Sequence, residues 1–219
     1  MISYAFVKNS PELNTYIKKA DEALGAMGFT EHSFAHVTKC AVEAGNLLEA
    51  LGYDARTVEL TRIAGYMHDI GNMVNRNGHA HSGAIIAFQL LQKWGMAPEE
   101  IAAIVSTIGN HDESTAFPVS PMAAALILAD KSDVRRSRVR NQNPAEFDIH
   151  DRVNHAVDSA QLALDLAEQT VTLNLMIDTS QCPVLDYFEI FMDRMLLCRR
   201  AADRLGLKFR LNINGASIL

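Results

Sequence analysis

Apolar residues recur at helical spacing through most of the chain, and this periodicity constrains the fold more than any other feature. In one such segment, Val37, Ala41, Ala44 and Leu48 form a single stripe, and Gly52 stops the pattern. The pattern predicts helices over Pro11–Gly25, Ser33–Leu51, Asp54–His68, Ser82–Trp94, Pro98–Gly109, Pro121–Arg138 and Asp151–Glu168. Because no repeat or Gly/Pro-rich linker divides the 219 residues, we expect one mostly α-helical domain over residues 1–219.

The spacing of apolar residues changes near residue 170. Apolar residues tend to occupy every second position in two segments, Val171–Ile177 and Lys208–Ile213. Both segments are also rich in strand-forming residues, so each predicts a strand. Asp186–Leu205, between them, returns to helical spacing. The sequence therefore predicts a C-terminal extension over residues 169–219, an α+β appendage with a small β-hairpin-like sheet beside the helical bundle.

Charge and composition exclude several classes of partner. A net charge of -6 gives no electrostatic basis for binding a nucleic-acid polymer. The longest apolar stretch, Met122–Ala129, is too short to cross a bilayer, and Met1–Ser10 lacks the pattern of a signal peptide. Cys40, Cys182 and Cys198 share no close spacing, which is typical of a reducing compartment. We therefore expect a cytoplasmic protein with no membrane partner and with Cys40 as a small core residue.

Histidines and aspartates stand in a particular order along the predicted helices. His68 and Asp69 are adjacent at a helix end, where both side chains can face a metal beyond the terminus. His36 lies upstream near the start of a helix, and Asp130 lies downstream at the end of the run Ala123–Ala129. A carboxylate in so apolar a segment is expected to be buried, and a buried charge must be paired or bind a metal.

A second His-Asp pair, His150-Asp151, provides an internal comparison. Asp151 opens a predicted helix, where an acidic residue interacts favourably with the helix dipole, and nothing around the pair in the sequence resembles a site. The first pair differs because further candidates follow it in order. His79 stands four residues before Gly83, and His111 ends the fifth predicted helix.

This ordered set resembles the HD-domain phosphohydrolase superfamily, whose pattern is His…His-Asp…Asp on a bundle of helices. The resemblance covers about residues 31–140. It is closest to members with two additional histidines, which include the cyclic-dinucleotide phosphodiesterases of the HD-GYP type and the dinucleoside tetraphosphate hydrolases. In these members the third histidine precedes a glycine by four residues, which favours His79 over His81. The Gly-Tyr-Pro segment of the HD-GYP type is missing around residues 110–118, so a cyclic-di-GMP phosphodiesterase is not expected.

The resemblance implies a centre for one or two divalent metals, in which Asp69 reaches both. One group of implied ligands is His36, His68, Asp69 and Asp130, and the other is His79 and His111. Fe, Mn, Zn and Mg are the candidate ions, and imidazole favours the transition metals. The resemblance further implies His68 and Asp69 as catalytic residues. The expected reaction is hydrolysis of a phosphoester or phosphoanhydride in a nucleotide-like small molecule by metal-activated water.

One position departs from the family pattern. Many catalytic members carry Lys three residues after the Asp of the pair, where this chain has Asn72. Asn72, Arg76, Lys131 and Arg136 are the candidate substrate-binding residues. The departure leaves two alternatives open, namely a non-catalytic nucleotide or metal sensor that acts through a protein partner, and a fold that keeps metal only for stability.

Two other histidines and the oligomeric state also stay open. His81 is an alternative ligand to His79, because only one residue separates them. His32 lies four residues before His36 and is a candidate substitute or outer ligand, although a surface or capping role is favoured. A homodimer through the C-terminal strands is a further possibility.

Overall fold

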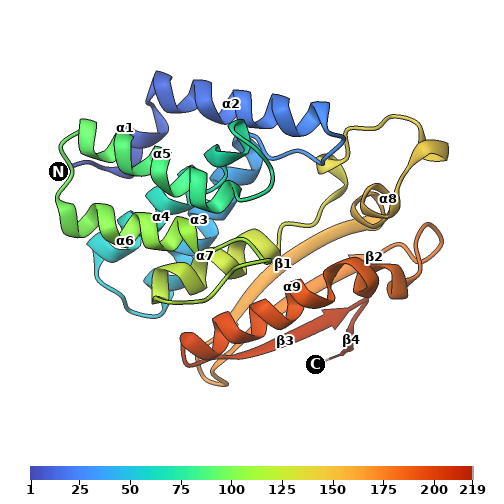
Figure 1. Ribbon diagram of the computed structural model, residues 1–219. Helices are drawn as coiled ribbons and strands as arrows, with labels where there is room; N and C mark the ends of the chain where they lie inside the picture. Colours follow the sequence, from blue (N-terminus) through green and yellow to red (C-terminus); the bar gives the residue numbers. More distant parts are fainter. Residues whose placement is uncertain (219) are drawn as a thin grey trace.

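The computed structural model describes residues 1–218, in which a helical bundle is joined to a C-terminal layer of helix and sheet (Figure 1). The bundle comprises α1 (Tyr4–Lys8), α2 (Pro11–Ala26), α3 (Phe34–Ala50), α4 (Ala55–Met67), α5 (His79–Lys93), α6 (Pro98–Gly109) and α7 (Pro121–Lys131). Three short 3₁₀ helices lie in the connections, η1 (Ile70–Met73), η2 (Arg136–Arg138) and η3 (Pro144–Glu146). The predicted mostly helical class is confirmed.

Local capping explains where several helices begin. The side chain of Ser10 accepts a hydrogen bond from the backbone N–H of Leu13, at the start of α2. Asp54 caps α4, and Ser120 caps α7, in the same way. Helix α7 ends at Lys131, earlier than the sequence predicts, because the chain leaves the helix and turns into η2.

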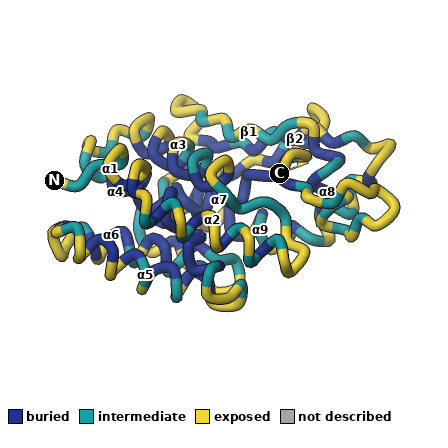
Figure 2. The backbone as a smooth tube through the Cα atoms, turned by 90° about the horizontal axis from the view of Figure 1, so that it is seen from above, coloured by how far each residue is buried: buried dark blue, intermediate teal, exposed yellow. Residues whose placement is uncertain are grey.

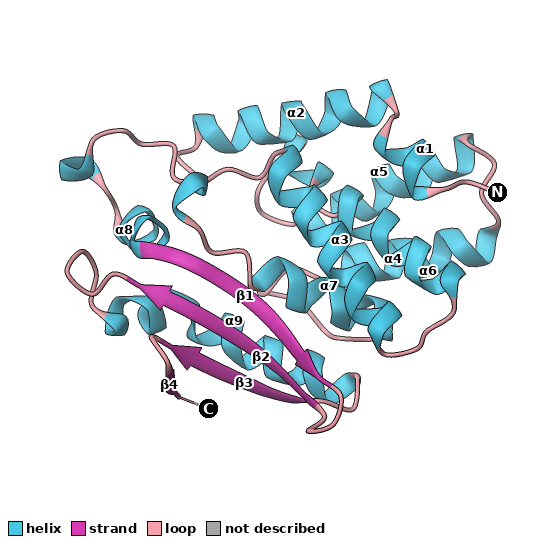
Figure 3. Cartoon of the chain, turned by 180° about the vertical axis from the view of Figure 1, so that it is seen from behind, coloured by secondary structure: helices cyan, strands magenta, loops and turns pink. Residues whose placement is uncertain are grey.

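The C-terminal layer is built around one long helix. It comprises α8 (Ile149–Ala156), β1 (Val157–Asp165), β2 (Thr170–Ile177), α9 (Val184–Arg204), β3 (Lys208–Ile213) and β4 (Ala216–Ser217). The sheet has the order β1-β2-β3-β4 (Figure 3). Strands β1 and β2 are antiparallel, β2 and β3 are parallel, and β3 and β4 are antiparallel. Helix α9 packs against β2 and β3 and also along α7 of the bundle.

The predicted helix over Asp151–Glu168 is wrong beyond α8, since the chain continues as strand β1. This segment is rich in Ala and Leu, which favour helix, but pairing with β2 overrides that weak preference. Leu162, for example, lies opposite Leu173. The two predicted strands are confirmed as β2 and β3. They pair in parallel because α9 returns the chain to the end of the sheet where β2 begins, so that β3 runs in the same direction as β2.

Two glycines permit the close packing that brings the ends of the helices together. A Cβ on Gly65 would lie 2.7 Å from the Cα of Ala41, so α4 approaches α3 at backbone distance. A Cβ on Gly71 would lie 1.9 Å from the carbonyl oxygen of His79, so η1 presses equally closely on the start of α5. The buried residues lie in the interior of the molecule, and the exposed ones lie along its periphery (Figure 2). Within residues 1–218, no helix combines the length and hydropathy needed to span a membrane.

Candidate metal centre

The structure brings all six predicted ligands together at one end of the bundle. They lie at the first turn of α3, at the end of α4, at the first residue of α5, just past α6 and in the last turn of α7. Their exposed fractions are all 8% or less. The six residues are His36, His68, Asp69, His79, His111 and Asp130. His81, the alternative to His79, is exposed on α5 outside this cluster.

Four of these residues form a first group with closely spaced ligand atoms. The Nε2 atom of His36 lies 3.3 Å from Oδ1 of Asp130 and 3.6 Å from Oδ2 of Asp69. The Nε2 atom of His68 lies 3.4 Å from Oδ2 of Asp69 and 3.8 Å from Oδ1 of Asp130. Ligand atoms about 2.1 Å from a tetrahedral ion are about 3.4 Å apart. The observed spacing therefore fits a bound cation.

A second group forms on the other oxygen of Asp69. Its Oδ1 atom lies 3.4 Å from Nε2 of His79 and 3.7 Å from Nε2 of His111. The two Nε2 atoms are 3.1 Å apart. Asp69 thus directs one oxygen to each group, which is the arrangement of a carboxylate that bridges two ions.

Hydrogen bonds orient the imidazole rings so that Nε2 faces the cluster. The Nδ1 atoms of His68, His79 and His111 lie 2.8, 3.0 and 2.6 Å from the carbonyl oxygens of Gly65, Arg76 and Ile108, respectively. A proton on Nδ1 satisfies each carbonyl and leaves the lone pair on Nε2. Burial lowers the pKa of His68 and of His79 to about 4, so both rings are neutral at pH 7 and can act as ligands.

Two buried atoms in the first group have no hydrogen-bond partner within residues 1–218. They are Nε2 of His68 and Oδ2 of Asp69. Both are acceptors, so neither can satisfy the other, and an unsatisfied buried polar atom costs about 1–3 kcal/mol. A cation between them removes both penalties. Imidazole and carboxylate form a donor set suited to divalent transition metals, so the cluster is able to hold such an ion.

Asp133 holds His36 in place, and the sequence analysis did not assign it to the centre. The Nδ1 atom of His36 donates to Oδ2 of Asp133 at 2.8 Å. Burial opposes ionisation of Asp133, but the hydrogen bond from His36 and the guanidinium of Arg138 hold its pKa well below the usual range. A carboxylate behind a ligating histidine is a common feature of metal sites. The one sequence feature that could have indicated this role is the position of Asp133, three residues after the predicted ligand Asp130.

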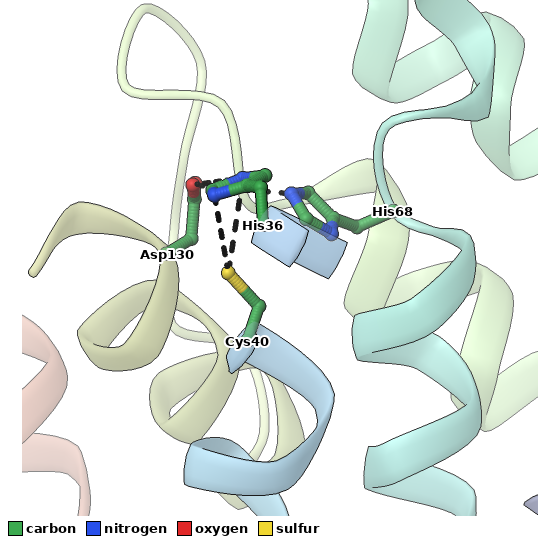
Figure 4. Close-up of side chains that lie close together, drawn as sticks. All are labelled: His36, Cys40, His68 and Asp130. Atoms are coloured by element: carbon green, nitrogen blue, oxygen red, sulfur yellow. Dashed lines mark hydrogen bonds and ion pairs between the residues drawn. The ribbon is translucent and has the colours of Figure 1, made fainter. Parts of the chain in front are cut away.

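Cys40 lies beneath the ring of His36 (Figure 4). Its sulfur is 3.7 Å from both ring nitrogens, so it contacts the face of the ring and not the in-plane lone pair that would bind a metal. Burial raises the pKa of Cys40 to about 11, which keeps it a neutral thiol. His32 packs edge-on against His36, with ring centroids 5.3 Å apart, and its Nδ1 contacts the carbonyl oxygen of Thr30.

The four predicted substrate-binding residues have different positions. Asn72 is fully buried and donates to the carbonyl and Oδ1 of Asp69, so it orients that carboxylate from outside the cavity. Arg76 and Lys131 both line the cavity next to the cluster. Burial opposes ionisation of Asp130, yet the Lys131 ammonium 2.6 Å away holds its pKa well below the usual range. Arg136 instead pairs with Asp158, and the structure does not bring it to the cavity.

The cavity beside the cluster measures about 190 Å³, and the C-terminal layer supplies one of its walls. His150, Asn154, Phe191 and Arg194 line it from α8 and α9, opposite Asp69 and Asp130. His150, which the sequence analysis set aside, thus lines this cavity, while Asp151 lies in the first turn of α8. None of these four residues carried a recognisable local motif, so periodicity and spacing alone could not find them.

Comparison with known proteins agrees with this geometry. Residues 33–136 match the family model of the HD domain. The chain is 25% identical over 162 residues to Uncharacterized protein MJ1020 of Methanocaldococcus jannaschii, covering 64% of this chain and 62% of that protein. It is 31% identical over 108 residues to Ribonuclease Y of Cutibacterium acnes, covering 49% of this chain and 18% of that protein. Ribonuclease Y of Desulforamulus reducens is 32% identical over 124 residues, covering 54% and 23%.

These relatives are longer than the aligned segments, and the match to each Ribonuclease Y spans less than a quarter of that protein. The family match extends from the start of α3 to the start of η2 and so contains all six clustered residues. The C-terminal layer lies outside it. Residues 33–136 therefore form the segment of this chain that matches the HD domain.

Proposed function

We propose that this protein is a metal-dependent phosphohydrolase that cleaves a phosphoester or phosphoanhydride of a nucleotide-like small molecule. One observation carries the proposal, namely that Asp69 directs one oxygen to each of two histidine groups. His36, His68, Asp69 and Asp130 would hold one divalent ion, and Asp69, His79 and His111 a second. Such ions polarise phosphate oxygens and activate water at neutral pH.

The side chains around the ligands have supporting roles in this proposal. Asn72 fixes Asp69 by two hydrogen bonds, and Asp133 fixes His36 by one. Arg76 donates to Asn72 and lies over the ring of Phe29, with its guanidinium 5.6 Å from the ring centroid. Among residues 1–218 no carboxylate pairs with Arg76, so its charge is available to a phosphate. Arg76 thus supplies the positive charge that Asn72 lacks.

The cavity supports a small substrate. Its volume of about 190 Å³ lies below the ~300 Å³ at which pockets for drug-sized ligands begin, so the cavity would enclose the phosphate end of a nucleotide-like substrate and not the whole molecule. The C-terminal layer closes one side of the cavity, which disfavours the passage of a polymer strand. A phosphorylated small molecule is therefore the proposed substrate.

Metal analysis and a hydrolysis assay test the proposal together. Purified protein should contain a divalent transition metal, and two ions per chain would support both groups, whereas one would remove His79 and His111 from the ligand set. With Mn²⁺ or Fe²⁺ and a panel of nucleotides, the protein should release phosphate or a nucleoside phosphate. His68→Ala should abolish release, and His81→Ala, the exposed control on α5, should not. Absence of turnover with every metal would refute the proposal.

The same experiments separate the sensor alternative. A sensor binds a nucleotide tightly in a calorimeter but yields no product on chromatographic analysis of the same mixture. The structure favours the hydrolase over the sensor on one point. Asn72, the residue that motivated the sensor, contacts Asp69 from behind and leaves the cavity unobstructed.

A further inference from the structure

Helix α9 presents two residues to the cavity from outside the HD domain. Phe191 and Arg194 are three residues apart, so they project from the same face of the helix, and both line the cavity. The opposite face of α9 carries Leu185, Met192 and Arg199, which line a separate apolar groove. The cavity-facing side of α9 is thus chemically distinct from the rest of the helix.

Arg194 is held rigidly at the cavity wall. Its Nε donates to Oε2 of Glu113 at 2.9 Å, and its Nη2 donates to Oε1 of the same carboxylate at 3.4 Å. The guanidinium lies over the ring of Phe191, 4.2 Å from its centroid. An arginine has five N–H donors, so two are directed at Glu113 and three have no partner among residues 1–218. The fork is therefore oriented in advance, with its free edge open to a ligand.

The other two arginines of the cavity wall differ in how far their donors are used. Arg138 donates to the carbonyl oxygens of Glu31 and Asp133 and is buried, so it serves the structure. Arg76 gives one bond to Asn72 and keeps its remaining donors. Arg76 and Arg194 are therefore the two arginines able to bind an anion in the cavity.

These two arginines are held by different parts of the cavity wall. Arg76 is adjacent to His79, whose Nδ1 contacts the Arg76 carbonyl oxygen. The Arg76 side chain bonds Asn72 and lies over Phe29, whereas that of Arg194 pairs with Glu113 and lies over Phe191. Asp69 lies between His79 and the first group, since it contacts both. A ligand that meets both arginines must therefore contact both parts of the wall of this cavity.

On the basis of the proposed hydrolase function, we infer that Arg194 binds a second anionic group of the substrate, beyond the reacting phosphate. The substrate class is then a small molecule with a phosphate and a further phosphate or carboxylate. A guanidinium suits both anions, because its planar fork matches two oxygens on one atom. Arg194 is a specificity-determining residue in this view, and it comes from the layer that the HD domain lacks.

Calorimetry on the purified, metal-containing protein tests this inference without requiring turnover. The probes are inorganic phosphate, pyrophosphate and phosphonoacetate, which carry one phosphate, two phosphates, and a phosphonate with a carboxylate. Wild-type protein should bind at least one two-anion probe more tightly than phosphate. Arg194→Gln should reduce that preference by about tenfold to a hundredfold, the range for hydrogen bonds to charged groups. The probe that loses affinity identifies the second anion.

Matched variants make the result decisive. Arg199→Gln removes a charge from the opposite face of α9 and should keep the wild-type preference. Arg194→Lys keeps the pair with Glu113 and should restore part of the binding. Equal loss of phosphate and two-anion binding in Arg194→Gln, or no preference in wild type, would overturn the inference.

If the protein proves to have no hydrolase activity, these binding results still decide the role of Arg194. If it is active, Arg194→Gln should raise KM for a two-anion substrate with little change in kcat.

Discussion

Replacement of Asp133 isolates the contribution of a carboxylate that touches no proposed metal ion. Asp133 accepts the Nδ1 proton of His36 at 2.8 Å and is 1% exposed, so no water replaces it. Loss of a partner behind a ligating histidine lowers metal affinity by about 10- to 100-fold, or about 1.4–2.7 kcal/mol. Asp133→Asn keeps an acceptor oxygen, so its loss of metal affinity should be close to about 10-fold, the lower value. Asp133→Ala removes the acceptor and should lie near the upper one.

Stability must be measured beside affinity, because Asp133 also lies against two arginines. It accepts from Arg135 at 3.0 Å and lies 3.7 Å from Arg138. Breaking a buried ion pair costs about 3–5 kcal/mol. The cost for Asp133→Asn should fall at or below the lower end, because Arg138 keeps its bonds to two backbone carbonyls.

The assay is titration of metal-free protein with Mn²⁺ against a competing chelator dye, with circular dichroism to verify the fold. Asp158→Asn is the control, since it removes an aspartate from an exposed pair with Arg136 that is worth ~0–1 kcal/mol. That variant should bind Mn²⁺ as wild type does. Wild-type affinity in folded Asp133→Ala would refute the reasoning, since His36 would then need no orienting partner.

Three further outcomes follow from the structure. Removal of bound metal with a chelator should lower the melting temperature by several degrees, because an ion present at 100 times its Kd contributes about 2.7 kcal/mol; an unchanged melting curve would contradict a metal held by the buried cluster. Gly71→Ala should destabilise the fold by more than about 2 kcal/mol in a denaturant titration, because the new Cβ would meet the His79 carbonyl at 1.9 Å, whereas Gly109→Ala, whose nearest contact is 3.8 Å, should be tolerated. Burial raises the pKa of Cys198 to about 12, so the folded state keeps a proton that the unfolded state loses above about pH 9, and stability should fall as pH rises through that range by up to about 1.4 kcal/mol per unit. A Cys198→Ser variant with the same alkaline slope would show that another group is responsible.

Much of the helical bundle could be predicted because its signals are local. Apolar spacing identified the helices from α2 to α7 to within a few residues, apart from the end of α7 and the start of α5. The burial of Asp130 was likewise predictable, since a carboxylate at the end of a continuous apolar run has no solvent-facing side to occupy.

The C-terminal layer was harder to predict, because its structure depends on pairing between distant segments. Residues 157–165 have the composition of a helix, yet they form β1, since hydrogen bonds to β2 and packing of its apolar side outweigh propensities of less than about 1 kcal/mol per residue. His150 has the same neighbour as His68, an aspartate. The order of the following histidines singled out the first pair, but only the fold shows that His150 lines the cavity.

The helical class, the order of the histidines and aspartates, and the resemblance to the HD domain, which the family match over residues 33–136 bears out, could thus all be read from the sequence. Each of these depends on residue type and on spacing along the chain. Tertiary structure alone decided that Asp69 directs one oxygen to each histidine group, that Asp133 fixes His36, and that Arg194 of α9 faces the cavity. Arg194 lies 81 residues from Glu113, and contacts at such separation are set by how the layers pack, which no local pattern encodes.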